Sequence, residues 1–405
     1  MKMLYDLIVA GGGAAGMMAA ITAAENGKHV LIIEKMNRLG KKILATGNGR
    51  CNFTNSYLDQ QCFRGSNPDF AYIALEQFGW EETADFFRRL GIEVVDKDGY
   101  YYPASNQAAT IADGLYYKLK SLDIDVVTDA VVEKAEKKKK CFTIYTKGKT
   151  YQAKNLLLAA GGMAQPKLGS DGSGYGLAKS FGHKLVEPFP ALTALKIKGF
   201  SWKEAAGVRS QAEIKVWQDG RMIAKEAGEL QITKYGVSGV MIFQLSRYVI
   251  FGMKKKKQIS LTIDLLPSKQ QNRSFFEQME EYSYYKTAAQ WLEGYLPSKL
   301  VKAVLQMADV RGEKNVLQLN KKEKARIWNC LKEAEFQVSG WNEFDFAQVT
   351  AGGISTRQVS PYTMESELVE GLYLSGELLD IDGTCGGYNL QWAWTSGYLA
   401  GRSIQ

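Results

Sequence analysis

The first part of the chain alternates between apolar runs and short glycine-rich or polar breaks. Residues 4–10 form an apolar run of strand length, residues 17–26 are rich in alanine without proline or glycine, and residues 29–33 are apolar again. Alanine favours a helix, and Gly27 directly after the second segment is a typical helix stop. The pattern therefore predicts a strand, a helix and a second strand in succession.

The break between the first strand and the helix reads Gly-Gly-Gly-Ala-Ala-Gly at residues 11–16, which fits G-x-G-x-x-G. In a βαβ unit these glycines allow a tight turn, close approach of backbone to a pyrophosphate, and close helix–strand packing. The second strand ends on Glu34, 18 residues beyond Gly16. A carboxylate there can accept hydrogen bonds from a ribose 2′-OH and would repel a 2′-phosphate. We therefore expect an adenosine without a 2′-phosphate, with its phosphates at the helix N-terminus.

A basic, glycine-containing loop follows Glu34. It holds four lysines and arginines within residues 35–42 and a Gly-Asn-Gly turn at residues 47–49. Such a loop can present N–H groups and cations to a diphosphate and a ring system. An ordinary polar surface loop is the alternative. A loop at the carboxyl ends of the strands lies where ligands bind, which favours a cofactor contact.

The next hundred residues indicate which dinucleotide is bound. The expected helices are 70–78, 81–90 and 107–122, and the expected strands are 125–135, 141–146 and 150–155, followed by a buried strand at 156–162. The three strands form an antiparallel meander, and the last strand ends in Gly-Gly, where backbone can approach a ligand. A plain NAD dehydrogenase would continue with βα repeats, so the meander favours an FAD-binding domain of the glutathione-reductase type.

Beyond Pro188 the periodicity changes and then returns. Residues 189–269 alternate with β period, and residues 270–341 look largely helical, with candidate helices at 287–295, 297–307 and 321–336. A late strand ends on Gly376-Glu377, and a final helix starts after Gly387. We expect an α/β fold: a Rossmann-like FAD-binding domain of residues 1–188 and 342–405, interrupted by a β-rich domain (189–269) and a small helical subdomain (270–341).

Composition excludes several classes of protein. Of the 405 residues 45% are hydrophobic, which suffices for a sizeable core, and no run approaches a transmembrane helix. No signal peptide is visible, and five cysteines without C-x-x-C spacing suggest reduced thiols in a cytoplasm. With only His29 and His183, we expect no metal site and no histidine-based triad. His183 is expected beside a helix C-terminus, as a cation facing the helix dipole.

The formal charge of +8 includes two runs of four lysines, at residues 137–140 and 254–257. They could contact nucleic acid or an acidic membrane. No aromatic residues are interleaved with either run, and each precedes a strand-like segment, which favours two solvated hairpin tips. We therefore expect no nucleic-acid partner.

Three segments together resemble one family. Residues 45–55, 350–355 and 376–391 are similar to the bacterial flavoproteins that include the 3-dehydro-bile acid Δ4,6-reductases and the aminoacetone oxidases. The similarity covers essentially the whole chain, and it implies an FAD domain interrupted by a β-rich and a helical domain. At Tyr100 the chain departs from the family, in which a basic residue is common.

The expected function is that of an FAD-dependent oxidoreductase, with hydride transfer through flavin N5. The resemblance implies either reduction of a conjugated C=C in a steroid or bile-acid-like enone by NAD(P)H, or oxidation of a small amine by O2. With one dinucleotide fingerprint, NAD(P)H would dock only transiently. The rival hypothesis, a flavin-containing nucleic-acid binder, needs a contiguous basic face.

Candidate proton donors for the reduction are Tyr388, Tyr101 and Tyr102. The tyrosines at 100–102 could line a flat pocket or form a half-buried strand, and the sequence leaves both open. For Cys51, Arg50 could lower the thiol pKa. Cys62 has the wrong spacing for a redox pair, and Cys385 could be a partner only if the two flavin-facing loops met. We therefore expect Cys51 to be a packing or cofactor-contact residue.

The residues expected to contact FAD come from both ends of the chain. A late Gly-acid pair holds the ribityl chain in FAD enzymes, and the next helix directs its N-terminus at the flavin C2 carbonyl. The full set is Gly11, Gly13, Ala14, Ala15, Gly16, Glu34, Lys35, Lys42, Thr46, Gly47, Arg50, Cys51, Asn52, Val131, Ala160, Gly161, Gly376, Glu377, Gly387, Tyr388, Asn389 and Leu390.

Overall fold

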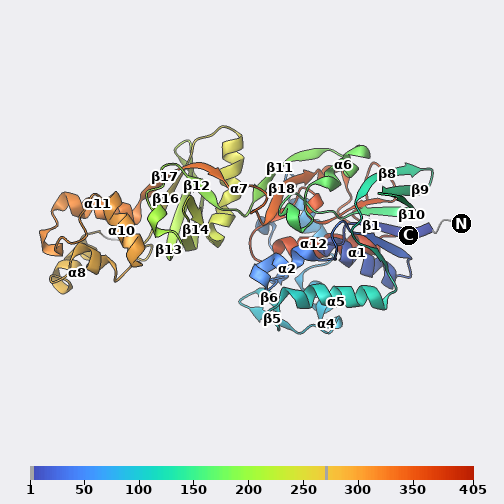
Figure 1. The fold of residues 1–405 in the computed structure, drawn as a ribbon, viewed down its shortest axis with the longest axis horizontal. Coiled ribbons are helices and arrows are strands. Elements are labelled where there is room, and N and C mark those ends of the chain that lie inside the picture. Colours follow the sequence, from blue (N-terminus) through green and yellow to red (C-terminus); the bar gives the residue numbers. More distant parts are fainter. Residues whose placement is uncertain (1–3, 270–271) are drawn as a thin grey trace. The chain divides into compact units, whose positions relative to one another are not determined.

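The computed structural model describes residues 4–269 and 272–405, and the chain divides into two compact units (Figure 1). The first unit comprises Met1–Pro190 and Phe344–Gln405, and the second comprises Ala191–Glu343. Both ends of the chain therefore build the first unit, and the second is an insertion. A separate helical subdomain within the second unit stays a prediction.

A seven-stranded sheet forms the centre of the first unit. Its parallel part runs in the order β7, β2, β1, β10, and β19 also pairs with β10; β9 and β8 continue antiparallel from β10. The bounds are β1 Leu4–Ala10, β2 Val30–Ile33, β7 Asp125–Val127, β8 Val132–Lys138, β9 Cys141–Thr146, β10 Lys149–Leu158 and β19 Leu372–Leu374. The predicted α/β fold with a Rossmann-like sheet is confirmed.

Two strand predictions were wrong. The segment 125–135 is not one strand: β7 pairs parallel with β2, and β8 pairs antiparallel with β9. Conversely, segments 150–155 and 156–162 belong largely to the single strand β10, which ends at Leu158. Its first half pairs with β9, and its last three residues, Leu156, Leu157 and Leu158, lie between β1 and β19 and are buried. Because the neighbouring strands change along β10, its first half is largely part-exposed and its end is buried, and the sequence pattern was therefore interpreted as two strands.

Helices and smaller strands complete the first unit. The helices are α1 Ala14–Glu25, α2 Lys41–Ala45, α3 Asp69–Leu75, α4 Trp80–Arg89, α5 Ala108–Ser121, α6 Ser173–Ser180 and α12 Tyr388–Arg402. The strands are β3 Thr54–Asn55, β4 Phe63–Arg64, β5 Val94–Lys97, β6 Tyr100–Pro103, β11 Leu185–Ala191, β18 Val349–Ile354 and β20 Asp382–Gly383.

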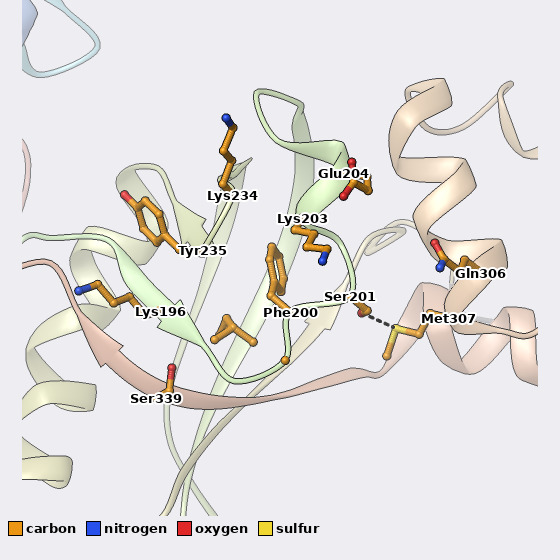
Figure 2. Close-up of a pocket in the computed structure, with 12 residues that line it drawn as sticks. Lys196, Phe200, Ser201, Lys203, Glu204, Lys234, Tyr235, Gln306, Met307 and Ser339 are labelled. Atoms are coloured by element: carbon orange, nitrogen blue, oxygen red, sulfur yellow. Dashed lines mark hydrogen bonds between the residues drawn. The ribbon is translucent and has the colours of Figure 1, made fainter.

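The second unit is a closed barrel with helices attached. The barrel order is β12 Leu195–Ile197, β15 Gly236–Ser238, β14 Arg221–Ile232, β13 Arg209–Gln218, β16 Ile259–Asp264 and β17 Ala334–Trp341, and β17 closes onto β12. The helices are α7 Val240–Lys254, α8 Asn272–Tyr282, α9 Ala288–Leu292, α10 Ser298–Met307 and α11 Lys321–Lys332. An open hollow lies beside β12 (Figure 2).

Sequence periodicity missed two features of this unit. It did not predict α7, whose buried Met241, Leu245 and Val249 recur at helical spacing. It also extended the last helix to residue 336, whereas α11 ends at Lys332 and β17 begins at Ala334. Ala334, like every second residue after it up to residue 338, is buried, because this strand closes the barrel.

Two predictions about basic and histidine residues also need correction. Residues 137–140 lie at the β8–β9 hairpin tip as predicted, but residues 254–257 follow the C-terminus of α7, where cations stabilise the helix dipole. His183 is buried, its Nε2 lies 2.8 Å from Ser366 Oγ, and burial lowers its pKa. A neutral, buried imidazole is not the dipole-facing cation that we expected.

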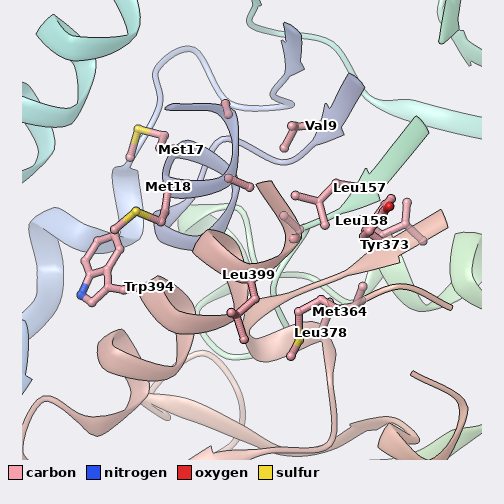
Figure 3. Close-up of a cluster of buried hydrophobic side chains, with 14 of the residues drawn as sticks. Val9, Met17, Met18, Leu157, Leu158, Met364, Tyr373, Leu378, Trp394 and Leu399 are labelled. Atoms are coloured by element: carbon pink, nitrogen blue, oxygen red, sulfur yellow. The ribbon is translucent and has the colours of Figure 1, made fainter. Parts of the chain in front are cut away.

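The helix α1 is buried between the sheet and α12 (Figure 3). Met17, Met18, Trp394 and Leu399 belong to this core. The two helices come very close, because a Cβ at Gly397 would lie 2.4 Å from the Ala15 carbonyl oxygen. This contact locks the last helix of the chain against the first. Among the described residues, no helix combines the length and apolar character of a membrane span.

Candidate active site

The turn between β1 and α1 requires its glycines. Gly11 has φ +114°, and a Cβ there would lie 2.5 Å from the Ala159 carbonyl oxygen. A Cβ at Gly16 would lie 2.0 Å from the Gly11 carbonyl oxygen, so both positions exclude side chains. Around Gly13 no atom lies within 4 Å of an added Cβ. The turn thus packs tightly against the protein at Gly11 and Gly16, and it has free space beside Gly13. Ala14 and Ala15 follow Gly13 as the first residues of α1.

The Glu34 carboxylate holds this turn in place. It is 9% exposed; Oε2 accepts the Gly12 N–H at 2.7 Å, and Oε1 accepts the Met36 N–H at 2.7 Å. Each oxygen keeps a second lone pair that a ribose hydroxyl can use. Sequence reasoning identified Glu34 but missed Gly12, whose contact depends on the folded turn.

Lys42 and Glu377 form an ion pair from opposite ends of the chain. Lys42 Nζ lies 2.7 Å from Glu377 Oε2, and Glu377 Oε1 accepts the Thr350 N–H at 2.9 Å. The Thr350 hydroxyl in turn accepts the N–H of Met163 at 2.7 Å. These bonds connect α2, β18 and the segments after β10 and β19. Thr350 was missed as a site residue, although it opens the segment 350–355 that carries part of the family resemblance.

The N-terminus of α12 meets the loop before β3. Gly387 has φ +95°, and a Cβ there would lie 2.9 Å from Asn52 Oδ1. Asn52 Oδ1 is buried and has no hydrogen-bond partner among the described residues. Asn389 braces the turn, since its Oδ1 accepts the Gly383 N–H at 2.8 Å. The site therefore holds an unused acceptor directly at a helix N-terminus.

Three further residues expected to contact FAD, Gly376, Gly161 and Ala160, pack against different parts of the first unit. Gly376 packs against α1, because its added Cβ would lie 3.0 Å from Ala15 Cβ. Gly161 adjoins Ser170, whose buried Oγ has no partner within the described chain and was also missed. Ala160 packs under α6, where it would meet a Cβ of Gly174 at 2.8 Å.

The basic loop is less uniform than expected. Lys35 Nζ pairs with Asp171 at 2.6 Å, whereas the exposed Arg50 donates from Nε to the Gly47 carbonyl at 3.2 Å. The Thr46 hydroxyl donates to the Ile43 carbonyl oxygen. Lys35 is therefore already paired with a carboxylate from a distant segment, and Arg50 with a carbonyl of its own loop.

Two expected contacts lie near the edges of the site. Val131 is 47% exposed and directly follows Ala130, which donates its N–H to the Glu34 carbonyl. Leu390 is half-buried in the first turn of α12. Both side chains are apolar, so either residue could contact FAD only through van der Waals packing.

The tyrosines expected as candidate proton donors lie in different surroundings. Residues 100–102 form β6, a half-buried strand, in which Tyr101 is buried against Trp80 with ring centroids 5.2 Å apart. Tyr388 lies instead near Tyr100, since both rings approach the Cβ position of Gly386 within 3.1 Å. Side chains alternate along a strand, so Tyr101 faces away from Tyr100 and Tyr102. The structure brings Tyr388 together with Tyr100, not with Tyr101.

Burial raises the pKa of Tyr388, as does a hydrogen bond to the Cys62 thiol. Burial also raises the pKa of Tyr102, and nearby Arg50 opposes that shift. Both phenols are therefore protonated at neutral pH, so each carries a proton that it can donate.

Cys51 is fully buried with φ +57°, and burial raises its pKa to about 12. Arg50 therefore does not activate the thiol, contrary to the possibility raised by its position. All five cysteines of the chain lie in the described part, and none of them forms a disulfide.

Comparison with known proteins shows the family to which the chain belongs. A family model described as the HI0933-like protein Rossmann domain matches residues 5–403. A relative from Clostridium scindens, named 3-dehydro-bile acid delta(4,6)-reductase, is 42% identical over 98% of both chains. Another, from Escherichia coli, is named ribosomal RNA dihydrouridine synthase and is 30% identical over 99% of this chain and 98% of that one.

Among solved structures, 3-ketosteroid delta1-dehydrogenase from Sterolibacterium denitrificans aligns over 99% of each chain, with a TM-score of 0.50 and 13% identity. At that identity the alignment shows a shared fold and nothing more.

Proposed function

Since the chain is an oxidoreductase that belongs to the HI0933-like Rossmann family, we propose that it uses FAD to reduce a C=C bond conjugated to a carbonyl group. The favoured substrate is a steroid or bile-acid-like enone, as in the name of the 42% identical relative. The proposed electron donor is NAD(P)H, docking transiently.

The reaction type has support from both named relatives. A bile acid delta(4,6)-reductase acts on unsaturated carbons of a steroid, and dihydrouridine is uridine with one ring C=C saturated. In uridine that bond is conjugated to a ring carbonyl, as in an enone. The two names therefore differ in substrate but share hydride and proton addition across a polarised C=C.

The residues present fit FAD. Gly13 leaves open space at the turn before α1, and the partnerless Asn52 Oδ1 within the described chain suits a ligand N–H. In this assignment the Glu34 carboxylate accepts a hydrogen bond from a ribose hydroxyl, and Lys42 and Glu377 bind the diphosphate–ribityl part. Gly387 caps the N-terminus of α12, whose positive dipole end would face the flavin ring system. Bound FAD would supply the hydride for the β-carbon of the substrate.

Tyr388 is the proposed proton donor. Its raised pKa keeps the phenol protonated, and its ring lies beside that of Tyr100 at the start of α12. The substrate α-carbon receives the proton as the β-carbon receives hydride, so the bond gains two hydrogens and the donor loses two electrons.

One observation carries the proposal: the glycine turn after β1 and the helix α12, which begins more than 370 positions later in the sequence, belong to one packed unit through Gly376, Gly397 and Ala15. Such an arrangement, in which a glycine turn near one end of the chain packs against a glycine-containing segment near the other end, is typical of FAD domains. Glycines that serve only for packing would not explain it.

The experiment has two stages. Heat-released cofactor is identified by mass spectrometry, and the bound flavin is then reduced anaerobically by NADH, NADPH or small amines in a stopped-flow spectrometer. FAD, reduction by a nicotinamide and reoxidation by a 3-oxo-Δ4,6 steroid are expected. Reduction by an amine alone would instead support the sequence-based alternative, an amine oxidase, and no flavin after reconstitution would end the proposal.

A second candidate, reduction of uridine in RNA, is favoured by the distribution of charge. Residues 191–343 contain 25 lysines and arginines against 16 aspartates and glutamates, whereas the rest of the chain contains 26 against 27. The excess of positive charge thus belongs to the inserted unit and not to the lysine runs alone, which revises the expectation of no nucleic-acid partner. Formation of dihydrouridine in ribosomal RNA, measured by nucleoside mass spectrometry with reduced enzyme, tests this candidate.

A further inference from the structure

The inserted unit contains an open hollow of about 880 Å³ (Figure 2). Its polar lining consists mainly of amines, hydroxyls and one amide, with a single carboxylate. The lining residues are Lys196, Ile197, Gly199, Phe200, Ser201, Lys203, Glu204, Lys234, Tyr235, Gln306, Met307 and Ser339.

Three separate segments present the lysines. Lys196 lies between Leu195 and Ile197 on β12, which are buried in the barrel, so strand alternation turns it outward. Lys203 begins a 3-10 turn, Lys203–Ala205, and Lys234 lies in the loop between β14 and β15. The fold, and not a local charge run, therefore brings the three lysines to one hollow.

These three lysines differ from many others in the unit. Lys215 and Lys225 pair with Glu213, and Lys257 pairs with Asp219. By contrast, Lys196, Lys203 and Lys234 are exposed, and none has a carboxylate at ion-pair distance within residues 4–269 and 272–405. Their charges are available for an external anion.

An aromatic pair accompanies the lysines. Phe200 is buried against Phe336, with ring centroids 5.4 Å apart, and forms a rigid wall. Tyr235 is 42% exposed, and its hydroxyl accepts a hydrogen bond from Asn342 Nδ2 at 2.8 Å. This bond fixes the phenol ring while leaving a face open, as a stacking platform requires.

We propose that this hollow binds single-stranded RNA, with Lys196, Lys203 and Lys234 on phosphates and a base stacked on Tyr235. The inference rests on the second candidate function, because an enzyme that reduces only free steroids needs no such site. Unpaired cations together with an exposed aromatic ring are the features of single-strand recognition. A duplex would keep its bases stacked away from Tyr235.

The test measures anisotropy of a fluorescein-labelled 20-nucleotide oligouridylate with full-length, FAD-loaded protein across a salt series. Each phosphate contact to a single strand contributes a slope of about −0.7 to log K against log salt. The variant Lys196→Ala/Lys203→Ala/Lys234→Ala should therefore lose about two units of slope. Tyr235→Ala should weaken binding roughly five- to 150-fold, the range for one stacked base.

The matched control is Lys215→Ala/Lys225→Ala/Lys257→Ala, which removes the same charge from ion-paired sites of the same unit. It should keep nearly the whole slope. An equal loss in both triple variants, an unchanged slope in the first, or efficient competition by NADPH or duplex RNA would overturn the proposal.

Flavin content and anaerobic reduction by NAD(P)H are measured for every variant and separate the two hypotheses. A wild-type protein that binds the oligonucleotide through these lysines without reducing its uridines supports the site and removes the second function. A protein that forms dihydrouridine equally well with all three lysines replaced, and binds the oligonucleotide unchanged, overturns the site and leaves that function standing.

Discussion

At the scale of the residue, Glu34 has a structural task before any ligand binds. Its two oxygens accept N–H groups from Gly12 and Met36, so the carboxylate shapes the turn that approaches the diphosphate. A residue expected only to contact ribose therefore also belongs to the frame of the site.

Replacing Glu34 should consequently affect the protein without cofactor. Glu34→Ala leaves a buried N–H unpaired and should lower the free energy of unfolding of the apoprotein by about 1–3 kcal/mol, with a further loss of FAD affinity. Urea unfolding and FAD titration measure the two effects. Glu34→Gln, which keeps one carbonyl oxygen, should lie in between; an apoprotein of unchanged stability in Glu34→Ala would contradict the structural task.

Cys51 gives a prediction about pH. Its pKa is raised from 9.0 to about 12 by burial, so the native state holds its proton where the unfolded chain releases it. The stability linked to this thiol is fully present below pH 9 and is lost as pH rises toward 12. Cys51→Ala should therefore show a shallower fall of unfolding free energy over that window, by denaturant titration.

The same burial makes Cys51 a packing residue and not a nucleophile. Cys51→Ser should keep flavin reduction within about tenfold of the wild type, which corresponds to roughly 1.4 kcal/mol in the barrier. A loss of several orders of magnitude with FAD still bound, seen by stopped-flow absorbance, would show that thiol chemistry had been wrongly dismissed.

At the scale of the element, the contact between α1 and α12 depends on glycines. Gly397 and Gly401 would each place a Cβ 2.4 Å from a carbonyl oxygen of α1. Close packing of the last helix on the first thus leaves no space for a methyl group.

Gly397→Ala should destabilise the protein by about 1–3 kcal/mol through overpacking, and should weaken FAD binding because α1 must shift. Gly176→Ala is the control: it lies within α6, and an added Cβ would meet no atom within 4 Å. Removing a helical glycine there should stabilise by about 0.5–1 kcal/mol. Thermal unfolding of both variants should show opposite shifts, and equal shifts would refute the packing argument.

Local features of the fold were predictable, and long-range ones were not. The turn at Gly11 to Gly16 and Glu34 lie within one βαβ unit, so spacing alone located them. The Lys42–Glu377 pair joins residues 335 positions apart, and no local pattern signals it. Strand β10 was divided in two because its neighbours change along its length. The sequence proposes Tyr101 and Tyr388 as alternative proton donors, but it does not show that Tyr101 packs against Trp80 while Tyr388 lies beside Tyr100.

At the scale of the whole molecule, the inserted unit enters and leaves the first unit at adjacent points. Asn342 donates its N–H to the Ala194 carbonyl at 3.0 Å, and the Thr193 hydroxyl donates to the Asn342 carbonyl at 3.0 Å. The incoming and outgoing chains are therefore fastened together at the boundary.

This arrangement predicts that the insertion is separable. Replacing residues 191–343 by a short glycine-serine linker should leave a yellow protein that retains FAD, since all the proposed FAD contacts lie in the first unit. It should also lose binding to the oligouridylate. The flavin absorption spectrum and the anisotropy titration measure the two properties, and a colourless product would show that the cofactor site needs the inserted unit.

The split of the first unit between the two ends of the chain also determines when it can be completed during synthesis. Strand β10 is made early, but its neighbour β19 starts at Leu372, and α12 ends at Arg402. Until the ribosome has released the residues up to Arg402, β10 has an open edge and α1 an uncovered apolar face. Unpaired edges and exposed apolar faces attract other chains. Nascent chains of this protein are therefore candidates for chaperone capture, and cofactor loading has to wait until α12 has left the ribosome.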